Sequence, residues 1–125
     1  MFLFLSLFLN YESLAKSDFS SIVIKSCYDG DTCTAIDGEK IRLACINTPE
    51  LKGENSDPVK AIKSRDFLNR LVAQRKISIR RIAKDRYGRT VAELYKGRIN
   101  IQELIVKKGF GKIYKKYAFQ CDWTK

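Results

Sequence analysis

The 125-residue chain contains no histidine. Histidine is the commonest general base near neutral pH and a frequent ligand of transition metals. Its absence excludes hydrolases that pair a serine or cysteine nucleophile with histidine, and it excludes most zinc sites. Any catalysis must therefore come from carboxylates, lysine, arginine, tyrosine or cysteine. Carboxylates combined with arginine indicate the chemistry of hard cations and phosphate groups.

Acidic residues are few, with 14 Asp and Glu against 24 Lys and Arg, so the formal net charge is +10. Such an excess points to a polyanionic partner: nucleic acid, an acidic membrane surface or an acidic polysaccharide. A basic surface without a special partner would give the same charge. The chain shows no long basic amphipathic helix, so action on membranes has little support. A hydrophobic content of 45% indicates one globular domain.

The strongly apolar segment at residues 1–9 (MFLFLSLFL) is too short to span a bilayer. It resembles the hydrophobic region of a secretory signal, and residues 13–15 (SLA) supply the small residues that signal peptidase prefers. We therefore expect residues 1–15 to be a signal peptide and residues 16–125 to be the mature domain, secreted or periplasmic. Because no Lys or Arg precedes the apolar segment, a buried N-terminal strand is the alternative.

None of the four cysteines stands in a C-x-x-C pair, so a cysteine metal site or redox motif is not expected. An even number of cysteines after an export signal favours disulfides. Cys27 and Cys33 flank a tight turn and could face each other across a hairpin, which would leave Cys45 to pair with Cys121. The sequence alone permits three connectivities.

The pattern of apolar residues and turn signals predicts the order β-β-β-α-β-β-α-β. The expected strands are 21–28, 31–36, 39–46, 76–83, 89–95 and 110–114, and the expected helices are 58–74, capped by Asp57, and 101–108, capped by Asn100. Alternation places Ile41, Leu43 and Cys45 on one face of the third strand, and Ile77, Ile79 and Arg81 on one face of the fourth. This order fits a mainly β, α+β fold: a five-stranded Greek-key barrel of the OB type.

Three motifs could carry chemistry. Asp29 and Asp31 in DGDT offer hard oxygen ligands for a cation, although an ordinary hairpin turn uses the same residues. Arg42 has a planar fork suited to phosphate, and Glu50 follows a proline that ends a strand; the alternative for each is a surface ion pair. Arg89 closes the turn DRYGR, which is otherwise a solvated basic turn.

Aromatic and basic residues alternate near the end of the chain. Lys112, Tyr114 and Tyr117 lie in the run KIYKKY, and Tyr87 lies beside Arg89. Bases can stack on aromatic rings while lysines follow the phosphates, which suits single-stranded or frayed nucleic acid. As a lone signal this run is weak.

Together, the motifs DGDT, R-x-x-x-x-N-T-P-E and D-R-Y-G-R resemble the thermonuclease-like family of the staphylococcal nuclease type, over about residues 22–117. The resemblance implies an OB-fold barrel with three helices that hydrolyses DNA and RNA with Ca²⁺ and leaves 3′-phosphates and 5′-hydroxyls. By position, it implies that the metal ligands are Asp31, Asn47 and Thr48, that the catalytic residues are Arg42, Glu50 and Arg89, and that the substrate-binding residues are Asp29, Tyr87, Lys112, Tyr114 and Tyr117.

Two departures from the family pattern matter. Asn47 stands where the family usually has a second metal-binding aspartate, so weaker metal binding is expected. The family's last helix should follow the region of Cys121, whereas this sequence stops at Lys125, so two helices are expected. The sequence therefore predicts a monomeric Ca²⁺-dependent nuclease, free of stable membrane association after signal cleavage. The alternative is a catalytically inactive OB module that binds nucleic acid or protein.

Overall fold

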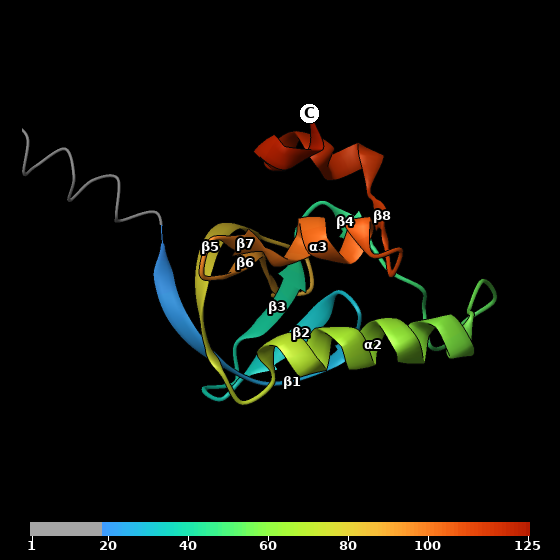
Figure 1. Ribbon diagram of the computed structural model, residues 1–125, viewed down its shortest axis with the longest axis horizontal. Helices are drawn as coiled ribbons and strands as arrows, with labels where there is room; N and C mark the ends of the chain where they lie inside the picture. The colour runs from blue at the N-terminus through green and yellow to red at the C-terminus, as the bar shows by residue number, and fades with distance from the viewer. Residues whose placement is uncertain (1–18) are drawn as a thin grey trace, which may run out of the picture.

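The computed structural model of the protein describes residues 19–125 (Figure 1). The predicted signal peptide at residues 1–15 lies outside the described residues. The strands are β1 (Ser20–Asp29), β2 (Thr32–Ala35), β3 (Lys40–Leu43), β4 (Ile46–Asn47), β5 (Lys76–Lys84), β6 (Thr90–Lys96), β7 (Ile99–Asn100) and β8 (Lys112–Ile113). The helices are α2 (Pro58–Val72) and α3 (Ile101–Lys107), followed by two 3₁₀ helices, η1 (Lys115–Gln120) and η2 (Asp122–Thr124).

Five strands close into a barrel. They are hydrogen-bonded in the order β3-β2-β1-β5-β6, and β3 also pairs with β6 in parallel, which completes the ring. The short strand β7 continues the sheet beyond β6, while β4 and β8 form a separate antiparallel pair. Within residues 19–125, this closed, mainly β barrel with two α-helices confirms the predicted OB fold.

The barrel core is aliphatic. Inward-facing positions alternate along the strands, as in β5, where Ile77 and Ile79 are buried between exposed or half-buried neighbours. Helix α2 buries Leu68 and Val72 against this core. The Asn69 side chain fixes the helix to β1, because its oxygen accepts the Cys27 N–H at 2.8 Å and its amide donates to the Cys27 carbonyl at 3.1 Å.

Both helices begin where the sequence predicts. The Asp57 carboxylate accepts the Lys60 N–H at 3.2 Å, with Pro58 in the first turn, and the Asn100 side chain accepts the Glu103 N–H at 3.1 Å. Helix α2 ends at Val72, two residues earlier than expected. Gln74 adopts a left-handed conformation (φ 61°), which turns the chain out of the helix and into β5.

The expected third strand, residues 39–46, is interrupted. After Leu43 the chain turns through Ala44 and Cys45, and Cys45 has φ 69°. The prediction that Cys45 shares the face of Ile41 and Leu43 is therefore wrong: Cys45 is buried in a second small cluster with Ala44 and Cys121. The turn sends the next segment, β4, away from the barrel sheet to pair with β8.

Arg81 also departs from its expected face. Strand alternation predicts that it shares a face with Ile77 and Ile79, yet its side chain is 43% exposed. A register shift in the β5–β6 pairing between Arg81 and Ala83 breaks the alternation at this point. The exposed guanidinium binds both carboxylate oxygens of Glu39, at 2.9 and 2.7 Å.

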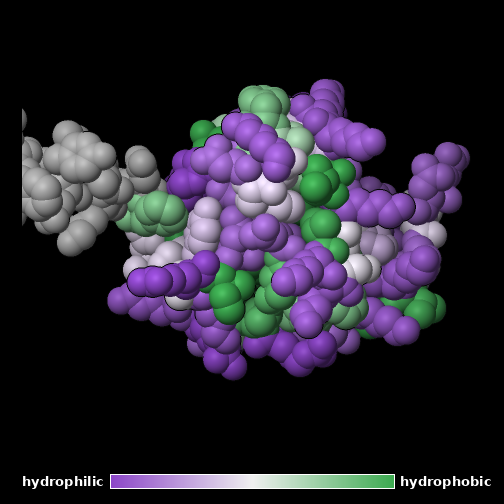
Figure 2. Space-filling model, turned by 45° about the horizontal axis from the view of Figure 1, so that its top comes forward, coloured by the Kyte–Doolittle hydropathy of each residue, from purple (hydrophilic) through white to green (hydrophobic). Residues whose placement is uncertain are grey.

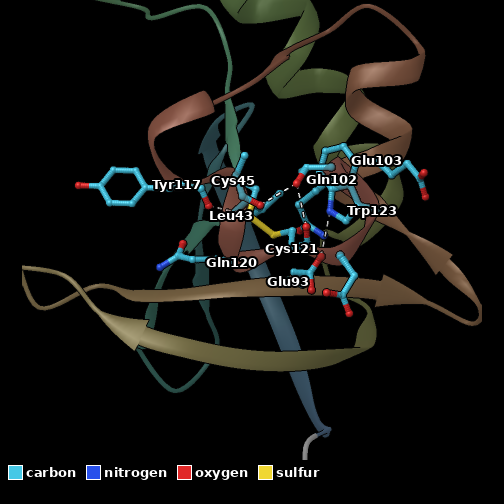
Figure 3. Close-up of a disulfide and its surroundings, with 12 residues drawn as sticks. Leu43, Cys45, Glu93, Gln102, Glu103, Tyr117, Gln120, Cys121 and Trp123 are labelled. Atoms are coloured by element: carbon cyan, nitrogen blue, oxygen red, sulfur yellow. Dashed lines mark hydrogen bonds between the residues drawn. A yellow bond between two sulfur atoms is a disulfide. The ribbon is translucent and has the colours of Figure 1, made fainter.

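Both disulfides match the predicted pairing. Cys27–Cys33 joins neighbouring positions of β1 and β2, and Cys45–Cys121 joins the β3–β4 turn to the C-terminal segment. After β8 the chain forms the 3₁₀ helices η1 and η2, which lie at the top of Figure 1. Trp123 covers the core there, and its ring N–H donates to Glu93 at 3.0 Å (Figure 3).

Hydrophilic residues dominate the face shown in Figure 2 and surround separate apolar patches. The large apolar side chains that are exposed include Val59 (66%) and Phe119 (73%). Within residues 19–125, no helix combines the length and the hydrophobicity needed to cross a membrane.

We expect the ion pair between Glu39 and Arg81 to make stability depend on pH. Hydrogen bonding to Arg81, helped by Thr90, lowers the pKa of Glu39 from 4.5 to about 2. A lowered carboxyl pKa stabilises the folded state fully above 4.5, and this contribution is lost as the pH falls through about 2. Glu39→Gln should cost about 1–2 kcal/mol at pH 7, since solvent screens the exposed arginine. Urea unfolding from pH 7 to pH 2 should show the two proteins converging in acid; a constant difference would contradict the assignment.

Candidate functional site

Asp31 lies in the tight turn between β1 and β2 and is only 7% exposed. Its Oδ2 accepts the main-chain N–H of Thr48 at 3.0 Å, and its Oδ1 accepts the Thr32 hydroxyl at 3.2 Å. The Asp31 carbonyl also accepts the Leu43 N–H at 2.8 Å. The turn is thus tied to β3 and to the segment after β4, so that the predicted metal-binding carboxylate has a fixed position beside Thr48.

Two glycines allow this close approach. A Cβ atom at Gly30 would lie 1.9 Å from Ser64 Oγ, and a Cβ atom at Gly111 would lie 3.0 Å from the Asn47 carbonyl oxygen. The Ser64 hydroxyl donates to the Phe110 carbonyl at 2.8 Å. Helix α2 and the segment before β8 therefore support residues 47 and 48 from behind. The sequence motifs gave no sign of this support, because it joins residues that are far apart in the chain.

Asp29 begins the same turn and is half-buried. Its Oδ1 accepts the Asp31 N–H at 3.0 Å. Burial, followed by the negative charge of Asp31, raises the pKa of Asp29 from 3.8 to about 6, and Arg42 opposes the rise. The charge of Asp31 thus makes ionisation of Asp29 costly, which is the behaviour of two carboxylates that share a small space.

Arg42 connects the acidic turn to the strand that follows. One guanidinium nitrogen donates to the Leu43 carbonyl at 2.7 Å, and the other donates to the Asn47 side-chain oxygen at 2.9 Å. The second nitrogen also lies 3.5 Å from Asp31 Oδ2. Because only 16% of the Arg42 side chain is exposed, these contacts fix its fork at the border between the acidic turn and the cleft described below.

Arg89 is oriented by its own turn. Asp85 accepts the Arg89 main-chain N–H at 2.9 Å and its Nε–H at 2.8 Å. Although partial burial opposes it, hydrogen bonding to Arg89 lowers the pKa of Asp85. The Tyr87 ring centre lies 5.5 Å from the Arg89 guanidinium and 4.9 Å from that of Arg86. The turn therefore presents cations and an aromatic ring together.

A cleft of about 560 Å³ joins the two arginines. Of the predicted site residues, Arg42, Arg89, Tyr87, Tyr114 and Tyr117 line it. Residues that sequence reasoning missed also line it, among them Lys84, Arg86, Lys116 and Gln120. The turn DRYGR could have pointed to Arg86 and the run KIYKKY to Lys116, whereas Lys84 and Gln120 lie outside both motifs.

The remaining predicted residues lie outside the lining of this cleft. Asp29, Asp31, Asn47 and Thr48 form the acidic turn region reached through Arg42. Lys112 is exposed on β8, opposite Asn47. Glu50 is exposed in the loop after β4; its carbonyl accepts the Asp57 N–H at 3.0 Å, and a Cβ atom at Gly53 would lie 3.8 Å from its Oε2.

The donors near Asp31 are all oxygens. They comprise the Asp31 carboxylate and the Asn47 amide oxygen, which both contact Arg42, and the Thr48 hydroxyl, which is buried without a hydrogen-bond partner among the described residues. No group of three or more His, Cys, Asp or Glu side chains capable of holding a metal occurs within residues 19–125. This donor set fits a hard cation such as Ca²⁺ in chemistry, with little negative charge to hold it.

The closed barrel and the arginine-lined cleft define an OB-fold domain with a cationic groove. The chain belongs to the family of staphylococcal nuclease homologues, whose profile matches residues 40–124. It is 37% identical over 94 residues to a Haemophilus influenzae protein named an uncharacterized endonuclease, which covers 72% of this chain and 50% of that protein. Two Escherichia coli proteins of the same name, one from O157:H7, are 31% identical over 93 residues, covering 71% of this chain and 58% of theirs.

Proposed function

We propose that the protein is a Ca²⁺-dependent endonuclease that hydrolyses phosphodiester bonds of DNA and RNA and leaves 3′-phosphate ends. The observation that carries the proposal is Arg42: one guanidinium binds the oxygen-rich region of Asp31 and Asn47 and also lines the cleft shared with Arg89. The name of the bacterial relatives agrees with this activity, and the chain spans about half of the length of the Haemophilus relative.

Cation binding is assigned to Asp31, Asn47 and the Thr48 carbonyl. A bound Ca²⁺ would supply Lewis-acid polarisation of the phosphate and stabilise the developing negative charge. The protein's own part is to hold the oxygen donors in place, through the hydrogen bond from Thr48 N–H to Asp31 and the close packing at Gly30. Asn47 contributes a neutral oxygen where a carboxylate would add charge.

Each part of the proposed hydrolysis is assigned to particular residues of the chain. Glu50 is proposed to take a proton from the attacking water. The water oxygen bonds to phosphorus as the bond to the 5′-oxygen breaks, and the 5′-oxygen takes a proton from solvent water. Arg42 and Arg89 neutralise the charge that grows on the phosphate oxygens. Tyr87, Tyr114 and Tyr117 offer surfaces on which bases stack, and Lys112 follows a neighbouring phosphate.

The second candidate is an inactive OB module that binds nucleic acid or protein. The position of Glu50 favours it: this carboxylate is exposed and lies outside the cleft lined by the arginines. On this reading Asn47 has replaced a metal-binding carboxylate because catalysis is no longer needed. Arg42 and Arg89 would still hold nucleic acid by its phosphates.

Incubation with single-stranded DNA and RNA, in Ca²⁺ and in EGTA, separates the two candidates. The nuclease should cleave only with Ca²⁺, give products with 3′-phosphates, and lose about 10²-fold or more in kcat on Glu50→Gln. Glu54→Gln, in the same exposed loop, is the matched control and should keep full activity. Tight binding without any cleavage would favour the inactive module.

Replacing Asn47 by aspartate should strengthen Ca²⁺ binding. The change adds one negative charge to the oxygen donors and turns the Arg42 contact into an ion pair. We expect the Ca²⁺ dissociation constant to fall by about tenfold, or about 1.4 kcal/mol. Calorimetric titration of both proteins measures this, and Asn55→Asp, at an exposed position of the loop before α2, serves as a control for added charge. An unchanged or weaker affinity would show that Asn47 is not a ligand.

We further propose that the mature chain is residues 16–125, exported after removal of residues 1–15, and that it acts as a monomer on single-stranded or frayed substrate. The disulfides support an oxidising compartment. N-terminal sequencing of the exported protein tests the cleavage site.

A further inference from the structure

One wall of the cleft is built by the C-terminal tail, defined here as residues 114–125. Tyr114, Lys116, Tyr117 and Gln120 line the cleft from this segment, facing a lining that includes Arg42 and Arg89. Together the tail residues offer a cation, an amide and two aromatic rings. The rings of Tyr114 and Tyr117 meet edge to face at 5.1 Å. The position of the tail therefore sets the width of the proposed substrate site.

The tail has few attachments to the barrel. Between residues 115 and 125 only Cys121 is buried, and Phe119 is 73% exposed. Several of its hydrogen bonds are internal, such as that from Cys121 N–H to the Ala118 carbonyl at 3.1 Å. Three hydrogen bonds join the tail to the rest of the domain: Trp123 to Glu93 at 3.0 Å, Arg80 to the Gln120 carbonyl at 3.1 Å, and Tyr114 N–H to the Cys45 carbonyl at 2.8 Å. Such a segment, with little buried apolar surface, depends on its covalent attachment.

The covalent attachment of the tail, the Cys45–Cys121 disulfide, begins at Cys45, which lies beside the candidate site. Cys45 lies in the turn between Arg42 and Asn47, and its carbonyl accepts the Tyr114 N–H at 2.8 Å. In Figure 3 the Tyr117 ring points away from the Cys45–Cys121 disulfide, on the side opposite Trp123. The crosslink thus lies between the part of the tail that covers the core and the part that lines the cleft.

We propose that Cys45 and Cys121 are positioning residues of the substrate site: their disulfide holds Lys116, Tyr117 and Gln120 against a nucleic acid strand bound at Arg42 and Arg89. Reduction frees this wall and weakens binding of the strand, without removing any group assigned to the bond-breaking step. The inference rests on the nuclease function proposed above, and it makes substrate affinity dependent on an oxidising environment. The disulfide between Cys27 and Cys33 has no such part, because both cysteines lie outside the cleft lining.

The test compares the full chain with Cys45→Ala/Cys121→Ala and with the control Cys27→Ala/Cys33→Ala, each confirmed as folded by circular dichroism. A fluorescent single-stranded oligonucleotide in EGTA reports binding by anisotropy without cleavage. We expect the dissociation constant to rise about tenfold or more on loss of Cys45–Cys121, the size of a lost stacking contact, and little for the control. In Ca²⁺, KM should rise by a similar factor with a much smaller change in kcat. Equal effects of the two pairs, or none, would overturn the proposal.

A second variant keeps the disulfide and so does not depend on the stability of the cysteine variant. In Lys116→Ala/Tyr117→Ala/Gln120→Ala the wall side chains are removed while their attachment stays. Binding should weaken as much as on reduction of the full chain by a phosphine, and reduction of this variant should weaken it no further. An additional loss on reduction would mean that the disulfide acts elsewhere than through this wall.

The outcomes separate this inference from the proposed function. If the oxidised protein binds the oligonucleotide, loses affinity on reduction and never cleaves, the nuclease proposal fails and the positioning role stands. If it cleaves with Ca²⁺ and neither KM nor binding responds to the disulfide, the positioning role fails alone. An oxidised, folded protein that binds no nucleic acid would overturn both.

Discussion

Replacing Arg42 by methionine is expected to lower kcat for DNA hydrolysis by about 10²- to 10⁴-fold, or about 3–6 kcal/mol in barrier height. Methionine keeps much of the length of the side chain and removes the fork that contacts the Leu43 carbonyl and Asn47. Charge growing on the phosphate would lose one of the two guanidinium groups assigned to it, and Asp31 would lose its partner at 3.5 Å. Initial rates over a range of substrate concentrations, in saturating Ca²⁺, separate kcat from KM.

Two further variants make the result interpretable. Arg42→Lys keeps the charge and loses the bidentate geometry, so its kcat should fall between those of the wild type and methionine variant. Arg70→Met removes an equally charged residue from an exposed position of α2 and should leave kcat unchanged. Unfolding of each protein must be measured in parallel, since Arg42 also connects β3 to the acidic turn. Wild-type activity in a folded Arg42→Met protein would exclude the proposed role of this residue.

Removal of the Cys45–Cys121 disulfide is expected to lower the free energy of unfolding by about 4 kcal/mol, and removal of Cys27–Cys33 by about 2 kcal/mol. The difference arises because the crosslinked residues are 76 positions apart in the first case and 6 in the second, so the first restricts the unfolded chain more. A single core of this size supplies only modest stability, which makes the larger loss a large fraction of the total.

Urea unfolding of the two double alanine variants measures these values. In both variants the cysteines that become alanine are buried, so the loss of stability from any small cavity should be similar in the two proteins. Loss of the tail from the barrel should also expose Trp123, which packs on the core, and shift its fluorescence before the barrel unfolds. If both variants lose the same stability, or the Cys27–Cys33 variant loses more, chain entropy is not the dominant contribution.

Local patterns in the sequence were enough to predict the barrel fold. The cap at Asp57 before Pro58, the cap at Asn100 and the turn at Asp85–Gly88 involve contacts within a few residues, so composition specifies them directly. The fold class also followed, because three strands, a helix and two more strands have few ways to bury their apolar faces. The prediction for Cys45 is wrong because the strand alternation ends at a turn that the sequence does not mark with glycine.

The sequence predicts the residue types of the candidate site, and the structure shows which of these residues lie together. Arg42, Arg89 and Tyr87 line one cleft as the motif spacing implies, whereas Glu50 and Lys112 lie outside it. Gln120 and the support of Gly30 by Ser64 could not be found in advance. Such contacts join segments separated by tens of residues, and nothing local in the chain encodes them.

The sequence by itself determined the chemistry available to this protein: without histidine, it has carboxylate and amide oxygens for a hard cation and arginines for phosphate. Only the tertiary structure decided which of those groups meet. The parallel pairing of β3 with β6 closes the barrel, and Leu43, the last residue of β3, lies opposite Ala92 of β6. The Cys45–Cys121 crosslink then brings the tail over the cleft. Closure of a barrel and a disulfide across 76 residues are long-range events, and their energies depend on the whole chain packing together.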